Sequence, residues 1–363
     1  MPGPFRADQV GSLLRPAALI AARGEAKRGG LPAAELRRLE DDAIREVVAR
    51  QEAIGLQAVT DGEFRREWWH LDFLRQLEGV TIRENPGPKF GGTEEQPPIA
   101  TVTHKVRYTK PVMVEDFKFL RGTTQRTAKL TIPSPSMLHL RGGRNSISRE
   151  AYPDLDEFWR DVAAAYRAAI AAFAAAGCSY LQLDDVGFAY LADEKFRDSC
   201  RRNGDDPREL PARYVGTIND ALKQRPRGLV VTLHTCHGNF RSSWATEGGY
   251  ELVAESMFQS DIDGFFMEFD SARSGSFEPL RYLPRTKKVV LGLVTTKVGE
   301  LESSDTLVRR IHEAAKFVPL ENLCLSPQCG FSSNETGNKL SEDAQWRKLE
   351  LVVEVARRVW GTK

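Results

Sequence analysis

Residues 154–185, DLDEFWRDVAAAYRAAIAAFAAAGCSYLQLDD, contain the unit of structure that decides the fold. Apolar residues recur at helical spacing in the first part, which predicts a helix from Asp154 to Ala176 that ends at Gly177. The second part, 180–183, is a short apolar run that predicts a buried strand, and it ends in Asp184 and Asp185. A helix leading into a strand that is apolar on both faces is typical of a parallel sheet covered by helices.

The same unit recurs along most of the chain. Eight short runs are interpreted as strands, at residues 8–12, 56–60, 129–132, 180–183, 229–233, 264–269, 289–294 and 323–326. Helical patterns lie between them, including 36–54 before Gly55, a helix capped by Ser303 or Ser304, and a last helix near 341–360. Eight strands predict an α/β fold, a closed TIM (β/α)₈ barrel formed by a single catalytic domain over 1–363. An open, doubly wound sheet is the alternative.

One segment, about 79–109, departs from this pattern. It is rich in Gly and Pro at 85–98 and then alternates as Ile99-Ala100-Thr101-Val102-Thr103. Alternation with a period of two predicts a strand. We therefore expect a loop and a β-hairpin inserted after the second strand and reaching over the barrel mouth.

The composition excludes some classes of partner. The 363 residues are 41% hydrophobic and 28% charged, with 51 basic and 50 acidic side chains and a net charge of +1. This balance favours small-molecule substrates over nucleic acid or a membrane surface. Residues 1–4 lack the apolar core of a signal peptide, and 168–178 is too short to cross a bilayer, so we expect a cytoplasmic protein. Five cysteines there do not predict a disulfide framework, and a homo-oligomer is left open.

Polar residues follow the expected strands, at the end where TIM barrels carry their functional groups. His234 and Cys236 are two residues apart on one strand, so both side chains point to the same face. An imidazole and a thiolate are common zinc ligands, and Glu268 and Cys329 could complete a tetrahedral site. The alternative is a buried histidine with two buried thiols.

Six motifs in register carry a resemblance to a known family. His234-Thr235-Cys236, Glu268 with Ser271-Ala272-Arg273-Ser274, and Ser326-Pro327-Gln328-Cys329-Gly330 resemble the three zinc-binding stretches of cobalamin-independent methionine synthase. Val10-Gly11-Ser12, Asp61-Gly62-Glu63 and Gln182-Leu183-Asp184 match its homocysteine-binding stretches in the same order. The resemblance runs from about Asp8 to Trp360 and is to short, single-barrel relatives of the C-terminal half of that enzyme.

The resemblance implies a site and a mechanism. Zn²⁺ would be bound by His234, Cys236, Glu268 and Cys329, and the backbone of Val10, Gly11 and Ser12 would hold the substrate carboxylate. Glu63 and Asp184 would bind the amino group of a thiol such as homocysteine, with pairing to nearby arginines such as Arg65 and Arg66 as the alternative. A coordinated thiol loses its proton, so it could attack an alkyl carbon at neutral pH. Glu268 is the ligand that we expect to leave the zinc ion when the thiol binds.

The sequence departs from the family where the methyl donor binds. The folate-stacking tryptophan of the family falls in the stretch 131–136, where this chain has Pro135. The basic folate-contacting segment before a Pro-Pro pair is replaced by Glu94-Glu95-Gln96. We therefore expect a donor other than folate polyglutamate, such as a methylated corrinoid or a sulfonium compound.

The catalytic histidine that the family carries after the seventh strand is also absent. Lys297 stands near that place, and together with Asp184 it is a candidate catalytic residue. Lys297 could donate a proton or bind an anionic donor; alternatively, it pairs with Glu300 or Glu302. His139 and His237 are candidates for acid–base work or for structural hydrogen bonds. Residues 68–70, Trp-Trp-His, could line the donor side or form a helix packing face.

The leading interpretation is a zinc-dependent thiol methyltransferase of methionine biosynthesis. One alternative is alkyl transfer to a different thiol, as in epoxyalkane:coenzyme M transferases. Another is an aldolase or lyase in which Lys297 forms a Schiff base.

Overall fold

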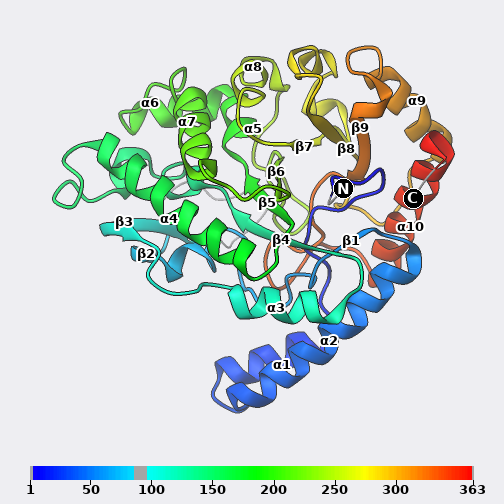
Figure 1. Cartoon of the computed structure of the whole chain (residues 1–363), viewed down its shortest axis with the longest axis horizontal. Helices are drawn as coiled ribbons and strands as arrows, with labels where there is room; N and C mark the ends of the chain where they lie inside the picture. Colours follow the sequence, from blue (N-terminus) through cyan, green and yellow to red (C-terminus); the bar gives the residue numbers. More distant parts are fainter. Residues whose placement is uncertain (1–2, 86–95, 362–363) are drawn as a thin grey trace.

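A curled, seven-stranded parallel sheet forms the centre of the protein (Figure 1). The computed structural model describes residues 3–85 and 96–361. The strands follow one another in the order β1-β4-β5-β6-β7-β8-β9. Their bounds are β1 Ala58–Val59, β4 Thr127–Pro133, β5 Tyr180–Asp185, β6 Val230–Thr235, β7 Gly264–Glu268, β8 Lys288–Val294 and β9 Leu323–Pro327. This α/β arrangement is the TIM-barrel fold that the sequence predicts.

Helices surround this sheet and cover its outer face. They are α1 Ala17–Lys27, α2 Ala33–Ile54, α3 Val114–Thr123, α4 Leu155–Ala175, α5 Gly187–Leu191, α6 Glu194–Arg202, α7 Leu210–Leu222, α8 Ala254–Met257, α9 Ser304–Ala314 and α10 Glu342–Trp360. The expected boundaries are confirmed by local chemistry. Asp154 caps α4 by accepting from the N–H of Asp156, and Ser341 caps α10 by accepting from Ala344. Gly55 ends α2 in the left-handed conformation, with φ of 101°.

The predicted first strand, 8–12, forms no ladder in the described part of the chain. Its backbone makes one parallel bridge, between Ala7 and Leu325 of β9. On the other side, the N–H of Leu13 donates to Gly62 O, at 3.0 Å, just beyond β1. The N-terminal segment thus closes the barrel between its two edge strands. Side chains hold it there, because the buried Asp8 accepts from Tyr180 Oη at 2.9 Å and from Lys129 Nζ at 3.3 Å.

The predicted insertion is a two-stranded antiparallel sheet of β2, Glu78–Arg83, and β3, Ile99–Arg107. Figure 1 shows it beside α4. Tyr152, just before α4, anchors it, because its hydroxyl accepts from the N–H of Val106 at 2.7 Å. The Pro- and Gly-rich residues 86–92, and Glu94 and Glu95, lie outside the described residues.

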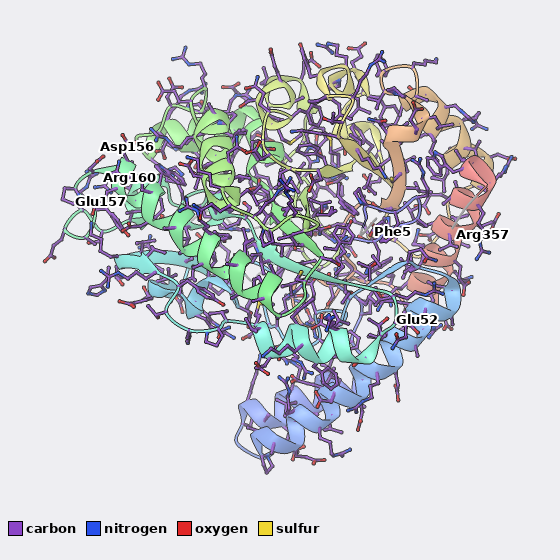
Figure 2. All side chains as sticks on the ribbon, in the orientation of Figure 1. Phe5, Glu52, Asp156, Glu157, Arg160 and Arg357 are labelled. Carbon is purple, nitrogen blue, oxygen red and sulfur yellow. The ribbon has the colours of Figure 1, made fainter. Side chains whose placement is uncertain are left out.

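The core lies between the sheet and the helices. All six residues of β5 are buried, and α4 turns Phe158, Val162 and Phe173 inward. Figure 2 shows Phe5 near the barrel strands and Asp156, Glu157 and Arg160 at the outer end of α4. No described helix is long and apolar enough to cross a membrane.

Candidate metal and substrate site

Three predicted metal ligands meet at the carboxyl ends of two strands. His234 lies in β6, Cys236 follows that strand, and Cys329 lies two residues after β9. Their ligand atoms all lie within 4.8 Å of one another. Although β7 and β8 separate the two parent strands in the sheet, its curvature brings their ends together. The structure thus brings together three of the four predicted ligands, and their role in binding a metal stays a prediction.

The donor set fits a zinc ion. The Sγ atoms of Cys236 and Cys329 are 3.8 Å apart. Two sulfurs at about 2.3 Å from a tetrahedral zinc would be separated by about 3.8 Å. Both ring nitrogens of His234 are buried, and neither has a hydrogen-bond partner within the described part of the chain. A buried imidazole without partners is costly, and a metal would satisfy one nitrogen.

The two thiols of the site lie within hydrogen-bonding distance of each other. Cys236 can donate to Cys329, and this hydrogen bond lowers the pKa of Cys329 well below its ordinary value. The same contact raises the pKa of Cys236. One thiolate is therefore already favoured at the position where a cation would bind.

Glu268 does not join this group of three among the described residues. It is the last residue of β7 and is fully buried. Its Oε2 accepts from the backbone N–H of His237 at 2.7 Å, and its Oε1 accepts from Arg273 and, at 3.3 Å, from Lys297 Nζ. Burial by itself would raise the pKa of Glu268, but Lys297, His237 and Arg273 outweigh it and lower that pKa well below its ordinary value.

Lys297 has different partners from those expected. It is buried and pairs with Glu268 and with Asp270, at 3.8 Å, so the expected pairing with Glu300 or Glu302 is wrong. Lys348 pairs with Glu302 instead. Both carboxylates that contact Lys297 would have to release it before its amine could form a Schiff base.

The segment 10–12 lies against Glu63, one of the two carboxylates that are predicted to bind the ammonium group of the substrate. Gly11 has a φ of 152°, and a Cβ there would lie 2.3 Å from Glu63 Oε1. Ser12 contacts the loop after Cys329: its Oγ accepts from the N–H of Ser332 at 3.2 Å. The expected carboxylate-binding backbone is thus tied directly to the segment that carries a metal ligand.

Glu63 and Asp184 line the same cavity but have different partners. Glu63 Oε2 pairs with Arg66, as the structural alternative predicted, whereas Arg65 pairs with Glu40 and Asp41. Asp184 accepts from Gln182 Nε2 at 2.7 Å. Burial raises the pKa of Asp184 to about 7, and the Glu63 carboxylate adds to this effect. An ammonium group beside Asp184 would compensate its charge.

These groups open onto one cavity. Its other walls include Trp68, Trp69, His70 and Tyr190. Trp68 stacks on Phe240, with ring centroids 5.8 Å apart and planes inclined by 19°. Trp68 forms an isolated antiparallel bridge with Asn334, and Trp69 and His70 lie in a turn, so the alternative of a helix packing face is wrong. Pro97, from the described end of the insertion, also lines the cavity.

Two candidate acid–base histidines have structural partners. His237 is fully buried and bonds to Glu268 and, at 2.7 Å, to Gly248 O. His139 bonds to Tyr214 Oη at 3.1 Å and Asp205 at 3.2 Å. Their rings orient neighbouring groups, as the structural interpretation predicts.

Sequence reasoning missed several residues that build the site. Arg141 lines the cavity, and Asn239 donates to Gly330 O at 2.9 Å, joining the loops after β6 and β9. Asp185 accepts from the hydroxyls of Ser134 and Ser136 in the stretch where the family carries its tryptophan. Only their position after barrel strands could have indicated these residues, because none belongs to a recognisable motif.

The fold and the site together define a TIM-barrel protein with a candidate thiol-rich metal site at the barrel mouth. Residues 5–358 match the family described as "Cobalamin-independent synthase, Catalytic domain". The chain belongs to this family, and this supports a methyltransferase related to methionine synthase.

Individual relatives agree with this assignment. The chain is 47% identical to the uncharacterised Bacillus subtilis protein YxjH over 98% of its own length and 95% of that protein. It is 24% identical to a methionine synthase from Pyrococcus abyssi, covering 88% of this chain and 84% of that one. The crystal structure of a putative vitamin-B12-independent methionine synthase from Listeria monocytogenes is 38% identical, with a TM-score of 0.80 and 99% of each chain covered.

Proposed function

We propose that this protein is a zinc-dependent methyltransferase that transfers a methyl group to homocysteine or a similar thiol, acting as one catalytic domain in the cytoplasm. The observation that carries the proposal is the convergence of His234, Cys236 and Cys329 at a cavity that Glu63 and Asp184 also line. Family membership supports the reaction class. A zinc ion bound by these three side chains would supply Lewis acidity that favours the thiolate form of the substrate.

The substrate is positioned by groups around the ligands. Asp184 and Glu63 would bind its ammonium group, and the backbone of Val10, Gly11 and Ser12 would hold its carboxylate. The sulfur would then face the three ligands, because those groups lie on one wall of the same cavity. Holding both reactants in place contributes several kcal/mol to catalysis.

Glu268 completes the ligand set in the proposed resting enzyme. In the described conformation its carboxylate is bound by Lys297, Arg273 and His237. These contacts hold the Glu268 carboxylate beside the three other ligands. They would also bind this carboxylate if a substrate thiol replaced it on the metal. Lys297 thus positions Glu268, and a direct role in protonating the leaving group remains a prediction.

The donor that we propose is not folate polyglutamate. Pro135 is buried in a 3-10 turn and offers the cavity no aromatic ring on which a pterin could stack. Trp68, Trp69 and Tyr190 instead give the cavity a large aromatic wall. A methylated corrinoid or a sulfonium compound fits the proposal, and a homo-oligomer stays open.

Metal content and thiol binding test the proposal. Purified protein should contain one zinc per chain, and the zinc form should release about one proton when homocysteine binds. Cys236→Ser and Cys329→Ser should lose the metal, whereas Cys324→Ser should keep it, because Cys324 is buried in a separate apolar cluster. X-ray absorption at the zinc edge should show an added sulfur ligand with homocysteine.

Different results in these experiments would favour the alternative functions. Proton release with coenzyme M but not with homocysteine would favour alkyl transfer to a different thiol. Protein that binds neither metal nor thiol would contradict the proposal, and borohydride trapping of a carbonyl substrate on Lys297 would then support a Schiff-base enzyme.

A further inference from the structure

Arg141 is a cation of the cavity without a charged partner in the described part of the chain. It lies in the loop after β4, between two 3-10 turns, and is half-buried. Its side chain makes no hydrogen bond or ion pair there, and its Nε is buried without a partner. Burial lowers the pKa of Arg141, and no nearby carboxylate offsets this. Arg66, the other arginine of the cavity, pairs with Glu63.

His70 supplies a second buried nitrogen without a partner beside Arg141. Its Nε2 lies 3.0 Å from Pro98 O, so it is the nitrogen that carries the proton and donates. Burial and the charge of Arg141 lower the pKa of His70 well below its ordinary value, which keeps the ring neutral. Nδ1 therefore has a free lone pair, and it is buried without a hydrogen-bond partner among residues 3–85 and 96–361. A cation that can donate hydrogen bonds, Arg141, and a neutral acceptor, His70 Nδ1, thus belong to the same cavity.

Arg141 and His70 line the same cavity as the groups that would bind the thiol, but they are not among those groups. The ammonium and the sulfur of that substrate already have partners in Asp184, Glu63 and the three metal ligands. Tyr190 lines the cavity together with Arg141, Cys236 and Cys329. Trp68 and Trp69 line it too, so a second substrate bound there could contact these rings as well as Arg141 and His70.

We propose that Arg141 and His70 form an anion-binding subsite for the methyl donor. It would take an anionic oxygen group, either a phosphate or a carboxylate. The guanidinium would donate to the anion, and a phosphate that retains one proton would also donate its O–H to His70 Nδ1. The subsite should therefore bind phosphate more tightly than a carboxylate. This inference rests on the proposed function, because it assigns the second substrate of the same cavity.

Calorimetry with inorganic phosphate and with acetate tests the inference. The zinc-loaded protein, saturated with homocysteine, should bind phosphate saturably and acetate more weakly. Arg141→Gln should weaken phosphate binding about tenfold or more, as expected for losing a charge-assisted hydrogen bond. His70→Phe should remove the preference for phosphate over acetate. Arg149→Gln is the matched control, because Arg149 is an exposed arginine of the same segment.

The homocysteine titration separates the two proposals. Arg141→Gln should release the same number of protons on homocysteine binding as the unaltered protein, which also shows that it folds. Unchanged phosphate binding in Arg141→Gln, or no saturable phosphate binding at all, would overturn the subsite. Displacement of homocysteine by phosphate would overturn it too, because the anion would then occupy the thiol site. If homocysteine fails to bind even the unaltered protein, the proposed function fails, and the phosphate titration without thiol still decides on Arg141.

Discussion

At the scale of single residues, Gly11 has little freedom to change. Its φ of 152° is unfavourable for other residues, and a Cβ would meet Glu63 Oε1 at 2.3 Å and Thr131 Cγ2 at 2.8 Å. Gly11→Ala should therefore displace the Glu63 carboxylate and weaken homocysteine binding by about tenfold or more, corresponding to about 1.4 kcal/mol. Calorimetric titration of the zinc form measures this.

Gly216→Ala provides the control for that substitution. Gly216 lies within α7, and a Cβ there would contact no other atom within 4 Å. Alanine should stabilise this helix by about 0.5–1 kcal/mol and leave homocysteine affinity unchanged. Equal affinities of the two variants would mean that Gly11 does not shape the binding site.

The five cysteines should fall into two classes when the metal is removed. Burial raises the pKa of Cys178 to about 12 and those of Cys200 and Cys324 to about 11. At pH 8 these three thiols are almost entirely protonated and therefore slow to react, since the thiolate is the nucleophile. A chelator should make Cys329 reactive toward a disulfide reagent, because its pKa is lowered, whereas Cys236, whose pKa is raised, should react slowly; the fast reaction should disappear in Cys329→Ser. Five reactive thiols would indicate unfolding instead.

At the scale of elements, we expect the contact between β4 and the N-terminal segment to be the most sensitive to substitution. Lys129 of β4 is fully buried and donates to Gln9 O and to the carboxylate of Asp8. Lys129→Met would leave the Asp8 carboxylate buried without its counter-charge, which typically costs 3–5 kcal/mol. Urea unfolding should show a loss of about this size.

Lys118→Met is the matched control for this element. Lys118 lies on the exposed side of α3 and pairs with Glu115. Its removal should cost less than about 1 kcal/mol, because exposed ion pairs contribute little. A similar loss in both variants would contradict the role that we give to the buried pair.

Periodicity predicted most elements, because most of them bury one face. The helices α4, α9 and α10 begin within one residue of their expected caps. The prediction failed at the first strand, whose Asp8 and Gln9 attach it through side chains, and the second shrank to β1, Ala58–Val59. A pattern of apolar residues cannot show that a buried polar side chain, not a backbone ladder, will hold a segment in place.

At the scale of the whole molecule, the candidate site joins distant parts of the chain. The resemblance correctly brought His234, Cys236 and Cys329 together, because a family motif records spatial neighbours that spacing alone does not. The orientation of Glu268 could not be predicted, since it depends on Arg273, Lys297 and His237 at the same time. The subsite of Arg141 and His70 also has no motif, and only the folded cavity brings these residues together.

A metal that links β6 to the loop after β9 should stabilise the entire barrel. A ligand that binds only the folded state contributes about 4 kcal/mol when its free concentration is about 1,000 times its Kd. Thermal unfolding of the zinc-free protein should therefore occur several degrees lower, and homocysteine should raise the midpoint of the zinc form only. An unchanged midpoint after chelation, with zinc loss verified, would argue against the metal site.

The closure of the barrel by its N-terminal segment has a consequence for biosynthesis. The partner of Ala7 is Leu325, so the segment emerges from the ribosome long before β9 exists. Cys329 follows β9 closely, and the last ligand of the candidate metal site thus arrives at the same late stage. Until then the nascent chain has an open sheet edge and an incomplete metal site. Chaperone protection and zinc supply should therefore matter at one moment, when β9 and the loop that carries Cys329 are translated.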